Sequence, residues 1–255
     1  MEFDYKQKLK EFIHGLHMQN LIVDEFVEFK FESLHNFPGT ESIKEIKDWY
    51  LALRKNSTMV ANRVPLNELK EWSLDENGSI VHSSGEFFRV EGYRIIGTDS
   101  REVQKGWDQP FLTQEGFDGG ILGLVRKRIN DIPFYLVEAK EEPGNYNIVQ
   151  ISTTLQATFS NIKRAHKGKK TNFSDLFLNP EKNNCKVLID QWTSEDGGRL
   201  FNKRNRSMLI ELSEDADIEL PNDRFKWITL FNIKELIRHE NAIVAPHLRG
   251  IISFI

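Results

Sequence analysis

Hydrophobic positions in the first 60 residues recur at helical spacing. In the segment 4–18 they lie three or four residues apart with charged residues between them, which predicts an amphipathic helix. The segment 22–34 fits a helix and a strand equally well. Ser42 followed by Glu45 forms a capping box, which predicts the start of another helix. We therefore expect residues 1–60 to form an N-terminal helical extension.

After residue 60 the pattern changes to short hydrophobic runs separated by turn residues. Strands are predicted at 87–96, 121–126, 134–139, 187–191 and 208–212, a late helix at 233–239, and an apolar tail at 251–255. Strands and helices that are mixed along the chain with short connections indicate an α+β or α/β core. We expect one domain over residues 61–255.

The run from Glu138 to Lys170 is densely polar, yet it is not patterned like a floppy loop. Its hydrophobic residues alternate with polar ones from Val149 to Phe159, which predicts an ordered, half-buried element after a turn at Pro143-Gly144. A buried polar group without a partner costs about 1–3 kcal/mol, so such a run either faces water or lines a polar pocket. A polar wall on an ordered element is typical of a sugar or nucleotide site.

Composition narrows the class of protein. The 255 residues carry a net charge of −4, which gives no overall attraction to nucleic acid or to anionic membranes. The single cysteine, Cys185, excludes an intrachain disulfide and fits the reducing cytoplasm. The charged N-terminus does not resemble a signal peptide, and no apolar window approaches the roughly 20 residues that span a membrane. We expect a cytoplasmic protein without nucleic-acid or membrane partners.

Two basic clusters are candidate anion sites. In the first cluster, from Lys163 to Lys170, the residues 167–170 are most simply a solvated surface. The second cluster differs, because Arg199, Arg204 and Arg206 follow a Gly-Gly pair and precede an apolar strand. Arginine binds phosphate oxygens in bidentate fashion, so this cluster is a candidate pyrophosphate site.

Other single residues have a structural and a functional interpretation. His166 lies in the polar run, where Glu138 and Glu142 could orient it or tune its pKa. Trp107 is either a core anchor or a ring that stacks on a nucleobase. None of the seven histidines stands at metal-ligand spacing from another His or Cys, so we expect no metal site. The P-loop, the dinucleotide fingerprint and the nucleophile elbow are missing from the sequence.

Many short motifs follow one another in a fixed order from about residue 64 to residue 250. They are Phe87-Phe88-Arg89-Val90-Glu91-Gly92, Arg101-Glu102-Val103, Trp107-Asp108-Gln109-Pro110, Gly120-Ile121-Leu122-Gly123, Ala139-Lys140, Glu142-Pro143-Gly144-Asn145, Gln150, Gln156-Ala157-Thr158, Asn161, His166, Ser194-Glu195, Gly198-Arg199, Arg204-Asn205-Arg206 and Trp227-Ile228-Thr229-Leu230. Together they resemble the NDP-hexose 2,3-dehydratase family.

The resemblance implies a cytoplasmic hydro-lyase of deoxysugar biosynthesis that acts on a dTDP-linked 4-keto-6-deoxyhexose without a cofactor. It also implies an α+β fold with a Nudix-like α/β/α core, although the Nudix catalytic-helix pattern is missing here. Members of the family carry two tandem copies of the unit, whereas this chain holds one. We therefore expect a homodimer that restores the two-unit arrangement.

Roles follow from the chemistry that the resemblance implies. Lys140 is expected to stabilise an enolate, and either Glu142 or His166 is expected to be the C3 base, with the other protonating the leaving hydroxyl. The expected substrate-binding residues are Arg89, Trp107, Gln109, Asn145, Asn147, Gln150, Gln156, Asn161, Arg164, Glu195, Arg199, Arg204 and Asn205.

Two other functions compete with the dehydratase. The first is a catalytically silent protein that binds nucleotide sugars. The second is an isomerase or epimerase of another 4-keto NDP-sugar, which would share proton abstraction at C3. The sequence separates the two enolate chemistries poorly.

Overall fold

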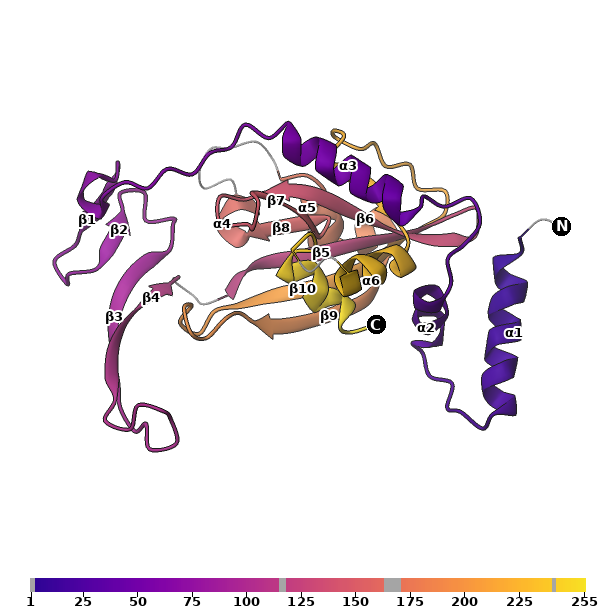
Figure 1. The fold of residues 1–255 in the computed structure, drawn as a ribbon, viewed down its shortest axis with the longest axis horizontal. Coiled ribbons are helices and arrows are strands. Elements are labelled where there is room, and N and C mark those ends of the chain that lie inside the picture. The colour runs from indigo at the N-terminus through magenta and orange to yellow at the C-terminus, as the bar shows by residue number, and fades with distance from the viewer. Residues whose placement is uncertain (1–2, 115–117, 163–170, 240–241) are drawn as a thin grey trace.

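A computed structural model describes residues 3–114, 118–162, 171–239 and 242–255. The chain begins with three helices, α1 (Tyr5–Met18), α2 (Val27–Leu34) and α3 (Ile43–Lys55). α1 and α2 lie at one end of the molecule, and α3 runs along the central sheet (Figure 1). The ambiguous segment 22–34 is therefore helical over its second part.

Local side-chain contacts start two of these helices. At α1 the Asp4 carboxylate accepts a hydrogen bond from the Gln7 amide at 2.9 Å. At α3 the predicted capping box is confirmed, because the Ser42 hydroxyl accepts from the Glu45 amide and the Glu45 carboxylate accepts from the Ser42 amide. Tyr50 anchors α3, since its buried hydroxyl donates to the Val149 carbonyl at 3.0 Å.

A four-stranded antiparallel sheet follows α3 and lies at the opposite end of the molecule from α1 and α2 (Figure 1). A 3₁₀ turn at Leu66–Glu68 leads into strands β1 (Trp72–Leu74), β2 (Ile80–His82), β3 (Arg89–Ile95) and β4 (Trp107–Thr113). Sequence analysis assigned Trp107-Pro110 to a turn, but these residues belong to β4. Because β4 is an edge strand, Pro110 costs it no hydrogen bond to a further strand.

The central sheet is mixed and has the strand order β11-β6-β5-β10-β9. Its strands are β5 (Asp118–Ile129), β6 (Ile132–Glu141), β9 (Cys185–Ser194), β10 (Arg204–Leu212) and β11 (Phe225–Ile228). β10 runs parallel to β5, and the other neighbours are antiparallel. The chain is an α+β protein, which confirms the predicted class.

The central sheet is split along its middle. β5 and β6 pair with each other only from Val125 opposite Leu136 to the turn that joins them. Beyond this point β7 (Val149–Ser152) pairs with β6, and β8 (Leu155–Thr158) pairs with β5. The alternating segment of the polar run thus forms a hairpin that occupies the split.

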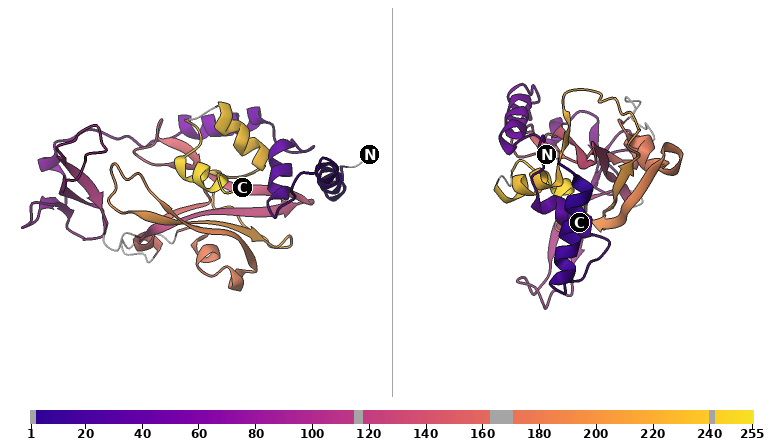
Figure 2. Two further views of the ribbon diagram at one scale, coloured as in Figure 1. Left: turned by 90° about the horizontal axis from the view of Figure 1, so that it is seen from below. Right: turned by 90° about the vertical axis from the view of Figure 1, so that its right-hand side faces the viewer.

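Hydrophobic side chains fill both faces of this sheet. On one face α3, α6 (Leu230–His239) and α7 (Pro246–Ile252) cover a cluster that includes Leu124, Tyr135 and Ile151. On the other face, the short helices α4 (Phe159–Ile162) and α5 (Ser174–Leu178) and a 3₁₀ turn (Glu181–Asn183) lie near a second cluster (Figure 2). The predicted apolar tail starts inside α7, which ends at Ile252, and Ile251, Ile252 and Ile255 pack into or against the first cluster.

The four-stranded sheet is joined to the central sheet through the loop between β9 and β10. The Leu112 amide donates to the Arg199 carbonyl at 2.9 Å, and the Phe201 amide donates to the Leu112 carbonyl at 3.0 Å. The rings of Tyr93 and Phe201 stack with centroids 4.2 Å apart. In the described ranges, no helix has the length and apolar character needed to cross a membrane.

Candidate functional site

A group of charged side chains stands where β6 ends at the split of the central sheet. Lys140 Nζ lies 3.6 Å from Glu138 Oε2 and 3.7 Å from Glu142 Oε1. Lys140 pairs with Gln150 across β6 and β7. The two carboxylates therefore hold the ammonium group between them, at the edge of a half-buried surface.

Burial perturbs the first of these carboxylates. Removal from water raises the pKa of Glu138, while the ammonium group of Lys140 and the guanidinium group of Arg224 act in the opposite direction. The net effect is a raised pKa for Glu138. The ammonium group of Lys140 thus partly offsets the cost of removing this carboxylate from water.

The turn after β6 is closely bonded to itself. The Glu142 amide donates to the Ile148 carbonyl at 3.0 Å, and Asn145 Nδ2 donates to the Lys140 carbonyl at 3.3 Å. Asn147 adopts the left-handed conformation with φ 61°, which asparagine tolerates better than most residues. Glu142, Asn145 and Asn147 are thus fixed next to Lys140 by the backbone of one short turn.

A second polar group forms where β9 ends and β10 begins. The Asn205 side-chain amide donates to the Glu195 carboxylate. Lys203 is buried, with Nζ 3.2 Å from Gln114 Oε1 and 4.8 Å from the centroid of the Phe88 ring. Burial lowers the pKa of Lys203, and Glu195 partly offsets this effect.

His247, in the first turn of α7, lies within the electrostatic reach of both groups. Burial lowers its pKa, Glu195 raises it, Lys203 lowers it and Glu142 raises it, with a lowered pKa as the result. This histidine is not among the residues that the sequence predicts for the site. Pro246 before it is a good helix-start signal, but no local pattern connects His247 to side chains that lie far away in the sequence.

The structure brings six of the predicted residues into these two groups: Lys140, Glu142, Asn145, Asn147, Glu195 and Asn205. Two more line the β7–β8 hairpin. Gln150 Nε2 donates to the Ala242 carbonyl at 2.8 Å, and Gln156 Oε1 accepts from the Ser152 hydroxyl at 3.1 Å.

Three predicted residues lie on the four-stranded sheet instead. Arg89 pairs with Asp75 at 2.8 Å. Trp107 Nε1 donates to Gln109 Oε1 at 2.6 Å, and Gln109 Nε2 donates to the Gly198 carbonyl at 3.1 Å. Gln109 also lines a groove of about 510 Å³. Residues 92–94 of β3 and 108–110 of β4 form this groove.

The remaining predicted residues are scattered. Arg199 is exposed and pairs with Asp196, and the Arg204 guanidinium lies 4.7 Å from the centroid of the Trp192 ring. Asn161 is exposed in α4, and its backbone amide donates to the Thr158 hydroxyl at 3.2 Å. Arg164 and His166 lie outside the described residues.

Across the described part of the chain, no three His, Cys, Asp or Glu side chains are grouped so that they could hold a metal ion. Cys185 is buried at the start of β9.

Comparisons with known proteins point to one family. Residues 43–255 match the family model described as NDP-hexose 2,3-dehydratase. The chain is 33% identical over 214 residues to a dTDP-4-dehydro-6-deoxy-alpha-D-glucopyranose 2,3-dehydratase of Amycolatopsis orientalis, covering 82% of the chain and 44% of the relative. It is 35% identical over 212 residues to the enzyme of the same name from Saccharopolyspora spinosa, covering 83% and 42%.

The chain therefore spans less than half the length of these curated relatives. Among solved structures it is similar to a Nudix hydrolase from M. Smegmatis, with a TM-score of 0.33, 10% identity, and coverage of 64% of this chain and 92% of the other. A TM-score of this size supports no argument about the site.

Proposed function

The chain belongs to the NDP-hexose 2,3-dehydratase family, and from this membership we propose that it removes water across C2 and C3 of dTDP-4-keto-6-deoxy-D-glucose. The product is a 3,4-diketo-2,6-dideoxy nucleotide sugar. The observation that carries the proposal is the position of Lys140, held between Glu138 and Glu142 at the split of the central sheet.

The substrate determines what such a site must supply. A C3 proton next to the C4 carbonyl is acidic because the electron pair left behind is delocalised as an enolate. The C2–O bond then breaks, the hydroxyl leaves with a proton as water, and the enol product tautomerises to the diketone. A proton and a hydroxide leave without net oxidation, so the proposal invokes neither a redox cofactor nor a metal ion.

Lys140 fits the place of the group that stabilises the enolate. Charge that develops on the C4 oxygen is stabilised most by a donor that is already oriented before the reaction. The two neighbouring carboxylates hold the ammonium group between them. From the sequence, Glu142 and His166 are the candidates for proton transfer at C3 and at the leaving hydroxyl.

Recognition of the substrate is assigned to the residues around this centre. Gln150, Gln156 and Asn161 are proposed to hold sugar hydroxyls, with Asn145 and Asn147 beside them. Arg89, Arg164, Arg199 and Arg204 are proposed for the pyrophosphate, and Trp107 with Gln109 for the base. The hydrogen bond from Gln109 to Gly198 supports a joint contribution of the two sheets, because it links the four-stranded sheet to the loop that carries Arg199.

A homodimer in the cytoplasm completes the proposal. It is supported by the length of the relatives, of which this unit covers only 42–44%. A twofold pair of such units would approximate one relative. Light scattering of the purified chain at several concentrations tests the dimer, and a monomer at every concentration would remove it.

The decisive experiment is incubation with dTDP-4-keto-6-deoxyglucose, followed by mass spectrometry of the nucleotide sugar. We expect the loss of one water, or release of free dTDP from the unstable product, only when enzyme is present. An unchanged mass with deuterium incorporation at C3 in heavy water would indicate an isomerase or epimerase. A bound but unchanged sugar without exchange would indicate a silent binding protein.

A further inference from the structure

Backbone pairing with β7 fixes the segment that directly precedes His247. The Ile151 amide of β7 donates to the Ile243 carbonyl at 2.7 Å, and the Ala245 amide donates to the Ile151 carbonyl at 2.9 Å. Val244 thus forms a parallel bridge with Ile151. α7 starts directly after this bridge, so the position of His247 is tied to β7.

Charged groups from three separate parts of the central sheet act on His247. Glu195 follows the end of β9, Lys203 precedes β10, and Glu142 follows β6. α7 packs against β5, β7 and β10, and from β5 and β7 no further described charged group acts on the ring. The charges that act on the half-buried imidazole therefore belong to both the Lys140 group and the Asn205 group.

We infer that His247 is the base that takes the C3 proton in the proposed dehydration, and returns it to the hydroxyl that leaves C2. This inference rests on the proposed function. In the first step the C3–H bond breaks, the proton moves to the imidazole, and the electron pair forms the enolate. In the second step the C2–O bond breaks, the imidazolium gives its proton to the departing oxygen, and one water leaves.

The surroundings of the ring suit this assignment. Burial and the ammonium group of Lys203 lower the pKa of His247, so the imidazole is neutral at pH 7 and can accept a proton. Once the ring is protonated, the carboxylates of Glu195 and Glu142 stabilise the imidazolium. The inference thus gives His247 the proton transfer for which the sequence offers Glu142 and His166, and leaves Glu142 to hold the ammonium group of Lys140.

The first test compares His247→Asn with His239→Asn. His239 is an exposed histidine at the end of α6 and serves as the matched control. For His247→Asn we expect kcat to fall about 100-fold or more, together with the rate of C3 deuterium exchange, since general-base catalysis contributes about 10²–10⁴-fold. Binding of dTDP and the urea midpoint should stay as in wild type, and His239→Asn should change neither rate.

Exchange at C3 separates this inference from the proposed function. If wild type dehydrates the sugar and His247→Asn keeps its exchange rate, the inference is overturned while the dehydratase stands. If wild type only exchanges C3 deuterium and His247→Asn abolishes that exchange, the base is supported and the dehydratase fails. If wild type shows neither signal, both are overturned.

A second test uses pH profiles, which a merely structural role would not move. Glu195→Gln removes a charge that raises the pKa of His247, so the acid limb of kcat/KM should shift to lower pH. Lys203→Met removes a charge that lowers the same pKa, so the limb should shift to higher pH. Shifts in the same direction, or no shift in either variant, would overturn the assignment.

Discussion

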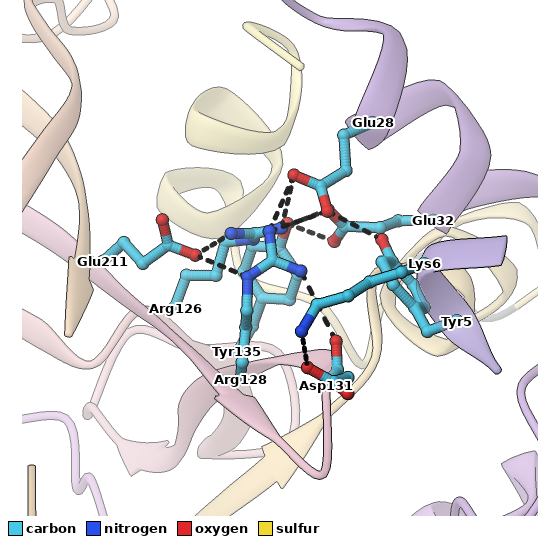
Figure 3. A network of polar contacts seen from close by, with 9 residues as sticks. All are labelled: Tyr5, Lys6, Glu28, Glu32, Arg126, Arg128, Asp131, Tyr135 and Glu211. Atoms are coloured by element: carbon cyan, nitrogen blue, oxygen red, sulfur yellow. Dashed lines mark hydrogen bonds and ion pairs between the residues drawn. The ribbon is translucent and has the colours of Figure 1, made fainter. Parts of the chain in front are cut away.

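Glu32 and Arg126 form an ion pair inside the protein, with Arg126 Nη2 2.7 Å from Glu32 Oε1 and side chains that are only 1% and 2% exposed. The hydroxyl of Tyr135 donates to the other Glu32 oxygen at 2.7 Å. Arg126 also contacts Glu28 of α2 and Glu211 of β10, as Figure 3 shows. The network fixes the N-terminal helices to three strands of the central sheet.

Glu32→Gln should destabilise the fold strongly. The substitution keeps the size of the side chain but leaves the buried Arg126 without its most deeply buried counter-charge, and breaking a buried pair costs about 3–5 kcal/mol. Urea unfolding followed by tryptophan fluorescence measures this loss. Lys44→Met, which breaks an exposed pair with Asp48 on α3, should leave the midpoint nearly unchanged. Equal midpoints for the two variants would contradict the structural role of the network.

Glu28 should make stability depend on pH in the acidic range. Burial raises the pKa of Glu28, but Arg126 and Arg128 outweigh burial and hold that pKa below its usual value near 4.5. The carboxylate therefore stabilises the fold at neutral pH, and this contribution is lost as the pH falls below 4.5 through the lowered pKa. Glu28→Gln should lower the urea midpoint at pH 7, and the difference from wild type should shrink towards pH 3. A difference that grows on acidification would refute this.

Lys140→Met should separate catalysis from binding. Loss of a preoriented donor to the enolate reduces kcat by about 10²–10³-fold. Binding of dTDP, measured by calorimetry, should stay close to that of wild type. Lys182→Met, at an exposed lysine in the turn before β9, is the matched control and should keep full activity. Equal losses of turnover and dTDP binding in Lys140→Met would reassign Lys140 to substrate binding.

Two adjacent glycines at the start of β5 should respond differently to alanine. A Cβ at Gly119 would meet the Lys203 ammonium group and lie 2.6 Å from Asn205 Oδ1, whereas one at Gly120 would meet the backbone of Ala157. The end of a side chain can move aside, but a paired strand cannot. Gly120→Ala should therefore lower the free energy of unfolding by about 1–3 kcal/mol. Gly119→Ala should mainly reduce turnover.

Gly144→Ala provides the control for both glycine variants, because a Cβ there would meet open space. Its activity and urea midpoint should both match wild type. The expectation for β5 would be wrong if Gly119→Ala lost more stability than Gly120→Ala while keeping its activity.

The sequence was most informative where structure depends on near neighbours. The capping box of Ser42 and Glu45 lies within one helical turn, and both of its hydrogen bonds form. The alternation from Val149 to Ala157 likewise corresponds to β7 and β8. Such patterns are visible because the partners are only a few residues apart.

Prediction failed where the partner is distant. The strand predicted to end at Arg126 continues to Ile129, because the charge of Arg126 is neutralised by carboxylates from α2 and β10. His247 stands 52 positions after Glu195, and it reaches the sheet through the pairing of β7 with the segment before α7 and through the packing of α7 on β5, β7 and β10.

The bridge between Ile151 and Val244 also has a consequence for synthesis on the ribosome. β7 emerges long before its second neighbour, and until residue 244 is available one edge of β7 has unpaired amide and carbonyl groups. Open strand edges are the usual starting points of intermolecular pairing. The nascent protein must therefore keep this edge of β7 solvated or guarded by a chaperone until residue 244 has been translated.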